Sequence, residues 1–230
     1  MIATIYDSPD AALDGIEDGV HIMFGGFVTA GTPSNLIRAL RRRGTKQITG
    51  IANNIGFGVL LDELCEDRQL RGMIATFAIR ASSAKKSRFE EQYRRGEVEL
   101  ELVPQGTFVE RIRSGGAGLG GVLTRTGLGT PVAVGKRTLE VEGVTYLLET
   151  PLRADVAILK AQRADRLGNL EYRGAGRNFN PIMAMAADLV IAEVEEIVEV
   201  GEIDPERVGT PAVFVDRIVR CDPILVQTNG

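Results

Sequence analysis

Two hydrophobic periodicities alternate along this chain. Short apolar runs, rich in branched side chains, are typical of covered β-strands, and they lie at 20–24, 47–52, 72–76, 98–103, 156–161 and 189–194. Between them, apolar positions at helical spacing predict helices at 8–16, 34–43, 59–64, 87–95, 107–114 and 180–187. Strands that alternate with helices indicate an α/β fold with an open, largely parallel sheet flanked by helices.

One region departs from this alternation. Residues 137–149 contain two runs of alternating polarity around Glu142-Gly143, which predicts a small hairpin. The sequence of 230 residues shows no internal repeat, low-complexity tract or linker, and 44% of its residues are hydrophobic. We therefore expect one domain over residues 1–230 with an ample packed core.

Composition narrows the class of protein. The net charge of −4 lacks the basic excess that nucleic-acid binders carry. No apolar run approaches the roughly 20 residues of a membrane span. The first residues show neither the basic nor the apolar region of a secretory signal. We therefore expect a cytoplasmic protein that binds neither nucleic acid nor membranes.

The sequence is poor in residues that bind metals or form nucleophile triads. Its two cysteines, Cys65 and Cys221, are far apart and lack metal-ligand spacing, so we expect free thiols rather than a disulfide. The single histidine, His21, excludes a histidine-rich metal site and lies in a predicted strand, where we interpret it as structural. We therefore expect no metal site.

The segment from Asp18 to Pro33 is the most informative part of the chain. A buried strand breaks into a turn that contains Gly25, Gly26 and Gly31, and a helix follows from Ser34. Unpaired amides and a helix dipole converge in such a unit, which suits an anionic or thioester-bearing ligand. The spacing matches neither the dinucleotide fingerprint nor a Walker loop. A purely structural turn is an equal interpretation of these residues alone.

Two further turns lie where a parallel sheet binds ligands. Asn53 and Asn54 end the second predicted strand, and their amides can donate and accept hydrogen bonds. Gln105 and Gly106 stand between a strand and a helix, where a neutral amide could hold a carbonyl oxygen or orient a carboxylate. Ordinary strand-ending turns explain both segments as well.

Three other segments carry less chemical information. The glycine cluster at 115–121 is interpreted as a flexible lid or a substrate loop. The arginines at 41–43 end a helix, where cations are favoured, and we interpret them as solvated. Four acidic residues are interpreted as the solvated side of a strand and turn: Glu193, Glu195, Glu196 and Glu199. The sequence therefore shows ligand-type turns but no nucleophile, as expected of a binding module or of half an active site.

Several segments at the expected separations make the whole chain resemble the A subunits of family I coenzyme A transferases. They are Asp18–Pro33, Ala52–Asn54, Pro104–Thr107, Glu110–Gly118, Lys160-Ala161, Asp165–Asn169, Arg177–Phe179 and Val194–Val198. The resemblance implies a loop associated with coenzyme A, made of Gly25, Gly26, Phe27, Val28, Thr29, Ala30 and Gly31. It also implies that Gln105 lines the substrate site, with Gly106, Asn53 and Asn54 as further candidate contacts.

Catalysis in that family uses a glutamate in a Ser-Glu-Asn-Gly motif of the B subunit, and this sequence has no such motif. The resemblance therefore implies no catalytic residue in this chain, partnership with a B subunit, and an A2B2 heterotetramer. Coenzyme A is expected as a substrate, with no permanently bound cofactor. A carboxylate nucleophile works through anhydride intermediates in a ping-pong cycle.

The acyl acceptor is expected to be 3-oxoadipate, with succinyl-CoA as donor, in aromatic catabolism by the β-ketoadipate pathway. Acetoacetate-type members usually carry Ser-Tyr-Val-Gly-Glu-Asn after the third strand, whereas this chain has an arginine-containing segment at 76–83. A longer insertion common in those members near 133–140 is also absent, and the run at 178–187 favours the same interpretation.

We predict that Arg80, or the neighbouring Lys85, binds the distal carboxylate of a dicarboxylic 3-oxoacid, although a plain surface charge fits equally. The A subunit of an acetoacetate or short-chain 3-oxoacid transferase is the first alternative. A non-catalytic module that binds acyl-CoA or a sugar phosphate is the second, because fold alone does not fix function.

Overall fold

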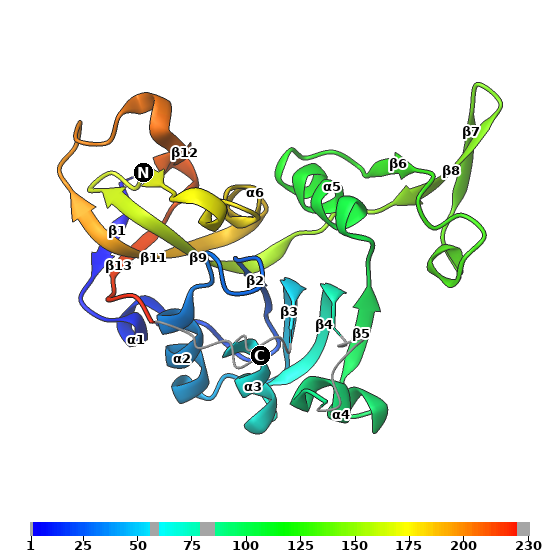
Figure 1. The fold of residues 1–230 in the computed structure, drawn as a ribbon, viewed down its shortest axis with the longest axis horizontal. Helices are drawn as coiled ribbons and strands as arrows, with labels where there is room; N and C mark the ends of the chain where they lie inside the picture. Colours follow the sequence, from blue (N-terminus) through cyan, green and yellow to red (C-terminus); the bar gives the residue numbers. More distant parts are fainter. Residues whose placement is uncertain (1, 56–59, 79–85, 225–230) are drawn as a thin grey trace.

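The computed structural model describes residues 2–55, 60–78 and 86–224 (Figure 1). Its centre is a parallel sheet with strand order β1-β13-β11-β9-β2-β3-β4-β5. These strands are β1 (Thr4–Tyr6), β2 (His21–Phe24), β3 (Ile48–Asn54), β4 (Leu70–Phe77), β5 (Glu99–Leu102), β9 (Ala154–Asp165), β11 (Ala187–Val198) and β13 (Arg217–Arg220). Two short strands, β10 (Leu170–Glu171) and β12 (Val208–Thr210), extend it through antiparallel pairs. The predicted parallel α/β sheet is confirmed.

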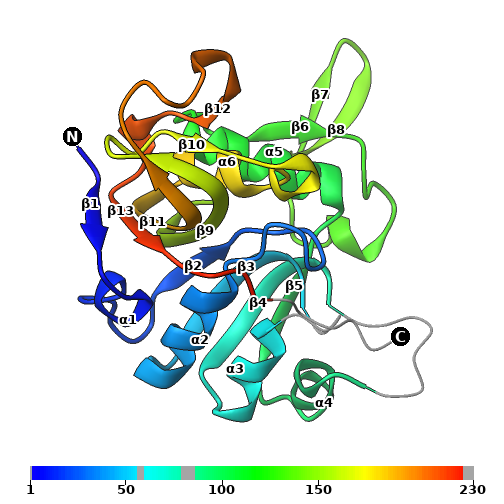
Figure 2. The ribbon, with the colours of Figure 1, turned by 60° about the vertical axis from the view of Figure 1, so that its left-hand side comes forward.

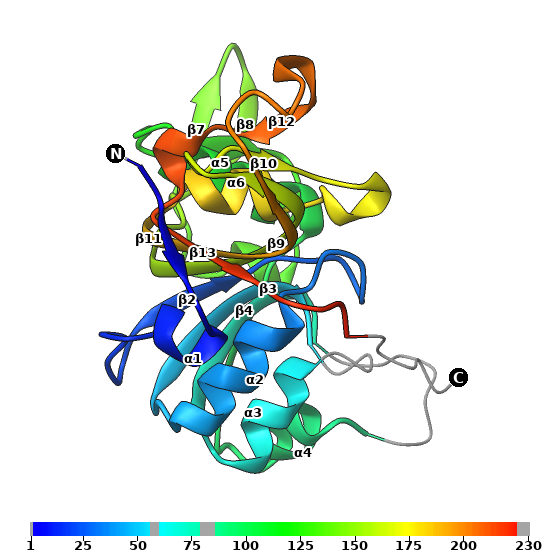
Figure 3. The same cartoon turned by 90° about the vertical axis from the view of Figure 1, so that its left-hand side faces the viewer.

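Helices cover both faces of this sheet. They are α1 (Pro9–Ala12), α2 (Ser34–Arg43), α3 (Glu63–Glu66), α4 (Arg88–Arg94), α5 (Gln105–Gly116) and α6 (Asn180–Met185). Short 3₁₀ turns are η1 (Leu60–Asp62), η2 (Pro131–Ala133), η3 (Gly174–Gly176), η4 (Pro205–Arg207) and η5 (Ala212–Phe214). Helices α1 to α4 lie on one side, and α5 and α6 lie on the other (Figures 2 and 3). The buried apolar residues accordingly form two clusters, one containing Leu36 and Leu40 of α2, the other Phe108 of α5 and Met183 of α6.

Local sequence signals explain where the longer helices begin and end. Helix α2 begins after Pro33 and ends at Gly44, whose φ of 78° is the left-handed conformation that glycine adopts freely. The Ser87 side chain caps α4 by accepting from the Glu90 amide at 3.1 Å. Both helices match the predicted bounds to within one residue at each end.

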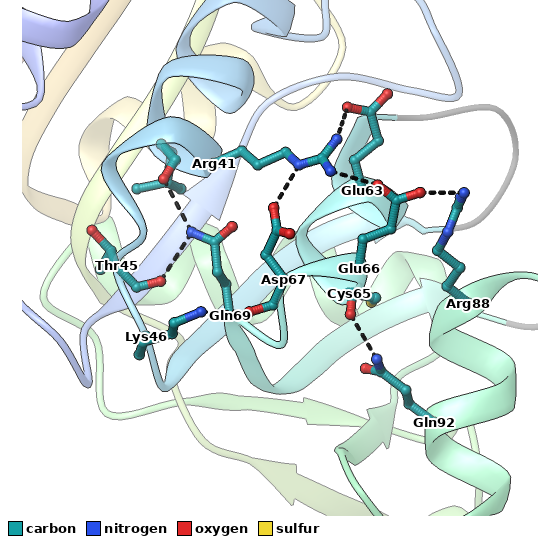
Figure 4. Close-up of polar contacts among 11 residues, drawn as sticks. Arg41, Thr45, Lys46, Glu63, Cys65, Glu66, Asp67, Gln69, Arg88 and Gln92 are labelled. Carbon is teal, nitrogen blue, oxygen red and sulfur yellow. Dashed lines mark hydrogen bonds and ion pairs between the residues drawn. The ribbon is translucent and has the colours of Figure 1, made fainter.

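The arginine-rich end of α2 is more structured than the sequence suggested. The Arg41 guanidinium donates to Asp67 at 2.7 Å and to Glu63 at 3.0 Å, and it also pairs with Glu66 (Figure 4). The three acidic residues lie on α3 and the turn that follows it, so Arg41 joins the two helices. Beneath it, the fully buried Gln69 amide donates to the Leu40 carbonyl at 3.0 Å. Arg41 is therefore a structural ion-pair residue rather than a solvated one.

Helix α5 begins earlier and ends later than predicted. Gln105 and Gly106 form its first turn, and Gly115 and Gly116 lie in its last turn. A β-carbon on Gly115 would overlap the Leu152 carbonyl oxygen, and one on Gly116 would lie 2.7 Å from the Met185 β-carbon. The first half of the glycine cluster is thus explained by close packing, and the lid interpretation is wrong for it.

A small antiparallel sheet stands apart from the central one (Figure 1). It contains β6 (Val122–Thr124), β8 (Val144–Glu149) and β7 (Thr138–Val141), in that order. Glu142 and Gly143 both have positive φ, 51° and 76°, as the two central residues of a type I′ hairpin turn require. The predicted hairpin is confirmed.

Two further expectations concern the state of the two cysteines and the presence of a membrane-spanning helix. Cys65 and Cys221 are free and buried, and burial raises the pKa of each thiol to about 12, so neither ionises at neutral pH. In the described parts of the chain, no helix has both the length and the apolar character needed to cross a bilayer.

Replacing Gly115 by alanine tests the packing role of the last turn of α5. We expect Gly115→Ala to lower the free energy of unfolding by about 1–3 kcal/mol, because the added methyl group overlaps the Leu152 carbonyl. Gly106→Ala is the matched control in the same helix, since a β-carbon there meets no atom within 4 Å. We expect it to be neutral or to stabilise by up to about 1 kcal/mol. Equal urea midpoints for the two variants would contradict this explanation.

Candidate functional site

The order of the strands creates a switch point between β2 and β9. From β2 the chain continues through α2 to β3 on one side, whereas from β9 it continues through α6 to β11 on the other. The connections therefore diverge at the carboxyl ends of β2 and β9, which is where open α/β sheets bind ligands. The glycine-rich loop at 25–33 leaves β2 at this position.

The loop has a tight and partly strained backbone. The Phe27 and Ala30 backbones exchange hydrogen bonds of 2.9 and 3.0 Å, which closes a small turn. Gly26 and Gly31 have φ values of 115° and 67°. Val28, a β-branched residue, also has a positive φ of 55°, a conformation that normally costs free energy. The surrounding contacts must therefore hold this geometry.

The predicted asparagine pair provides one of those contacts. The Asn54 side-chain oxygen accepts from the Val28 amide at 2.8 Å and from the Asn53 side-chain amide at 3.1 Å. The Thr76 hydroxyl of β4 donates to the Asn53 side-chain oxygen at 2.8 Å. Both asparagines are the last residues of β3 rather than a turn, and both are buried. The structure thus brings the asparagine pair and the glycine loop together.

A cavity of about 440 Å³ opens beside the loop, at the ends of β9 and β11. Its lining includes Ala30 and Gly31 of the loop, Lys160 and Gln162 of β9, Arg173 and Glu195. The Lys160 ammonium lies 3.2 Å from the Glu195 carboxylate, so the charges of these two groups offset each other. The cavity is therefore a crevice at the switch point that combines a mainly apolar lining with a few charged side chains.

The N-terminus of α2 is not the anion site that the sequence suggested. Glu193 of β11 is 1% exposed, and one carboxylate oxygen accepts from the Asn35 and Leu36 amides at 2.8 and 2.9 Å. Its second oxygen accepts from the Asn35 side chain at 3.3 Å and lies 3.7 Å from the Lys160 ammonium. An internal carboxylate thus occupies the place of an anionic ligand.

The interpretation of Glu193 as a solvated residue is therefore wrong. Burial raises the pKa of its carboxyl group above the usual value, against the opposing effect of the hydrogen bonds and of Lys160. The acidic cluster around it was misleading: Glu193 and Glu195 lie on the same face of β11 and both approach Lys160, yet only Glu193 is buried.

Gln105 and Gly106 lie at a different place on the carboxyl edge. Gly106 lines a second cavity of about 640 Å³, between the first turns of α5 and the strand β6. Gln105 is half-buried, and no hydrogen bond within the described ranges joins it to the glycine loop. The amides at the start of α5 have no side-chain cap, so they remain available to an acceptor.

Other predicted site residues are placed as follows. Arg80 and Lys85 lie outside the described residues. His21 is exposed at the start of β2, where its amide donates to the Asp155 carboxylate at 2.7 Å, as a structural residue would. Within residues 2–55, 60–78 and 86–224, no group of three histidine, cysteine or acidic side chains could hold a metal ion.

Glu193→Gln tests the internal cap of α2. Every group facing the two Glu193 oxygens is a donor, so an amide nitrogen in either orientation would face another donor. We expect the free energy of unfolding to fall by about 1–3 kcal/mol. Glu195→Gln is the matched control, because Glu195 pairs with the same lysine but is 36% exposed, and we expect a change below about 1 kcal/mol. If urea unfolding showed the same loss of free energy of unfolding in both variants, the role of Glu193 as the cap of α2 would be refuted.

Known proteins match this chain in sequence over most of its length. Residues 6–220 match the family profile described as Coenzyme A transferase. The chain is 48% identical over 220 residues to the A subunit of 3-oxoadipate CoA-transferase from Pseudomonas putida, covering 95% of this chain and 94% of that one. It is 50% identical over 216 residues to the A subunit of succinyl-CoA:3-ketoacid coenzyme A transferase from Xanthomonas campestris, covering 93% and 87%.

Solved structures share the fold at low sequence identity. Glutaconate coenzyme A-transferase from Acidaminococcus fermentans matches with a TM-score of 0.81 and 22% identity, over 96% of this chain and 76% of that one. An Escherichia coli acyl-CoA transferase, solved as a thioester complex with CoA, matches with a TM-score of 0.83 and 19% identity, over the whole of this chain and 51% of that one. The profile and the close relatives together show that this chain belongs to the A subunits of the family I coenzyme A transferases.

Proposed function

We propose that this chain is the A subunit of a heteromeric enzyme that moves coenzyme A from succinyl-CoA to a 3-oxoacid, with 3-oxoadipate as the acceptor. The observation that carries the proposal is the glycine loop at the β2/β9 switch point, where the Asn54 side chain fixes the Val28 amide and the loop residues Ala30 and Gly31 line a crevice. A preorganised loop of this kind suits a thioester, whose reacting carbonyl gains negative charge and needs fixed donors.

The donors of the loop fit that role. Within the described part of the chain, the amides of Thr29 and Gly31, two partly exposed residues, make no hydrogen bond, so they can donate to an acceptor on the ligand. The uncapped amides of Gln105 and Gly106 can bind a substrate carboxylate at the second position on the edge. Two separate donor sites suit a substrate that carries both a thioester and a carboxylate.

The crevice lacks a nucleophile of its own among the described residues. The Glu195 carboxylate pairs with Lys160, and the Glu193 carboxylate caps α2, so both are engaged. We therefore propose that a partner B subunit supplies a glutamate. Its carboxylate would attack the thioester carbonyl and expel the coenzyme A thiolate, which leaves a mixed anhydride. The thiolate would then attack the glutamyl carbonyl and release the first acid, and the acceptor would reverse both steps.

The choice of acceptor rests on the sequence after β4. The relatives include A subunits of 3-oxoadipate transferases from P. putida and Acinetobacter baylyi, both 48% identical, and A subunits of succinyl-CoA:3-ketoacid transferases at 41–50%. Overall identity thus favours neither acceptor, and acetoacetate is the second candidate. The arginine at position 80 favours a second carboxylate on the acceptor, because a guanidinium binds carboxylates in a bidentate way. It follows β4, whose carboxyl end lies on the same edge as the loop.

A coenzyme A transfer assay tests the proposal. The chain is assayed alone and co-purified with the product of a neighbouring gene that contains Ser-Glu-Asn-Gly, with succinyl-CoA and either 3-oxoadipate or acetoacetate. We expect activity only with the partner, an A2B2 mass for the complex, and faster transfer to 3-oxoadipate. Activity of the isolated chain would refute the proposal that a partner supplies the catalytic glutamate. Transfer to acetoacetate but not to 3-oxoadipate would refute only the choice of acceptor.

Arg80→Ala tests the acceptor contact within the same complex. We expect the kcat/KM for 3-oxoadipate to fall about 10–100-fold, because a lost charged hydrogen bond costs about 1.5–3 kcal/mol, while the value for acetoacetate stays within about twofold. Arg71→Ala is the matched control, since Arg71 is an exposed arginine near the opposite end of the β4 strand. An unchanged preference between the two acids in Arg80→Ala would rule out this role.

A further inference from the structure

A segment far along the sequence holds the glycine loop at positions other than the one that Asn54 holds. Its residues are Asn178, Phe179 and Asn180. The Asn178 side-chain amide donates to the Ala30 carbonyl at 3.0 Å, and the Asn180 side-chain amide donates to the Gly31 carbonyl at 3.1 Å. Between them, the Phe179 ring stacks on Phe27, with centroids 6.4 Å apart and planes within 13°. Three successive side chains thus hold three positions of one loop.

Asn180 is the centre of this arrangement. It is fully buried, and its amide nitrogen donates to the Gly176 carbonyl at 2.9 Å as well as to Gly31. Its side-chain oxygen accepts from the Lys160 amide of β9 at 3.1 Å. All of its main hydrogen-bonding groups are used, so Asn180 rigidly joins β9, the glycine loop and the segment before α6.

The same asparagine explains two glycines of the loop. A β-carbon on Gly25 would overlap the Asn180 side-chain oxygen, and one on Gly31 would lie 2.9 Å from its nitrogen. Gly31 also has a φ of 67°, which disfavours other residues. Gly25 is therefore required for close packing against Asn180, and Gly31 for close packing against the Gly176 backbone and Asn180, whatever ligand the loop binds.

The contact continues to the helix that begins with Gln105. The Phe179 ring meets Phe108 edge-on, with centroids 5.8 Å apart and planes at 72°. Phe108 is fully buried and lies one turn after Gln105 in α5. A row of three aromatic rings therefore connects the tip of the loop, where Phe27 is 40% exposed, to the first turn of α5.

The three residues 178–180 also set which backbone groups the loop offers to the crevice. They engage the carbonyl oxygens of Ala30 and Gly31, two residues that line the 440 Å³ cavity. The Gly31 amide keeps no partner within the described residues. A ligand oxygen at this position would meet a free donor, while the two neighbouring carbonyls each already accept at least one hydrogen bond.

We propose that Asn178, Phe179 and Asn180 are positioning residues, a clamp that holds the glycine loop in the geometry that binds acyl-CoA. This inference rests on the proposed function of the loop. Loosening the clamp weakens the fixed donors that face the thioester. Asn178 can be removed without disturbing the acceptor contacts at the start of α5, because its side-chain amide donates to Ala30 and Ala175, whereas Phe179 also packs against Phe108 of α5. Removal of Asn178 should therefore affect succinyl-CoA and the 3-oxoacid differently.

The first experiment measures amide hydrogen exchange in the full chain alone. Asn178→Ala removes one bond to the loop, and Phe179→Leu removes the stacking while keeping the site filled. We expect each to accelerate exchange in residues 26–32 roughly fivefold to tenfold, and to leave the hairpin at 138–149 unchanged. Arg177→Ala is the matched control, since among the described residues its side chain makes no hydrogen bond or ion pair to the loop and instead lies near Gly209. Unchanged exchange in both variants overturns the clamp.

The second experiment measures transfer kinetics with the co-purified partner. We expect the KM for succinyl-CoA to rise about fivefold to tenfold in both variants, in line with the loss of one neutral contact, while the KM for the 3-oxoacid stays within about twofold in Asn178→Ala. If amide exchange in the loop accelerates but the KM for succinyl-CoA stays unchanged, the positioning role is overturned. A wild-type complex that transfers no coenzyme A overturns the proposed function and with it that role, whereas the exchange rates still decide the clamp.

Discussion

The parallel pairing of β2 with β9 determines where the candidate site lies. β2 pairs with β9 only as far as Phe24 and Ile158, and the Gly25 amide makes a last bond to the Ile158 carbonyl at 3.0 Å. β9 then runs on to Asp165 without β2 beside it. The unequal lengths of the two strands leave a notch at the carboxyl edge, and the glycine loop and its cavity occupy that notch.

The notch creates a backbone problem, which a side chain solves. The Lys160 amide of β9 extends beyond the end of β2, and a buried amide without a partner costs free energy. The Asn180 side-chain oxygen accepts this hydrogen bond at 3.1 Å. A side-chain amide thus replaces the carbonyl that a longer β2 would have provided. Asn180 therefore both provides a hydrogen-bond acceptor for the Lys160 amide of β9 and holds the glycine loop.

The sequence predicted the elements well because each depends on local signals. Gly44 ends α2, Ser87 caps α4, and Glu142-Gly143 forms the hairpin turn, all through short-range backbone preferences. The sequence did not predict Glu193 as the cap of α2, because Asn35 and Glu193 are 158 residues apart. Such contacts follow from the order of strands in the sheet, which no local pattern encodes.

The predicted site residues divide in the same way. The glycine loop and Asn54 meet because they end neighbouring parallel strands, which the predicted sheet already implied. The roles of Asn178 and Asn180 were not predicted, although their segment carried part of the family resemblance. Asn178 and Asn180 stand out in the sequence as polar residues at the start of an apolar helix. The sequence does not show which groups they contact, because that depends on the path of the chain after β10. Arg80 stays a prediction from the sequence, because it lies outside the described residues.

Glycines in this chain serve two physical purposes that a sequence cannot separate. Gly44 and Gly143 adopt left-handed backbone conformations in open space, so only their φ values require glycine. Gly25 and Gly115 have ordinary backbones, but each lies against another group where a β-carbon would overlap. Gly31 combines both constraints, since its φ is 67° and Asn180 lies beside it. A glycine-rich loop next to a cavity is therefore not, by itself, evidence of ligand contact. The stronger argument for the loop is that its surroundings donate to the Ala30 and Gly31 carbonyls and leave the Gly31 amide without a partner in the described structure.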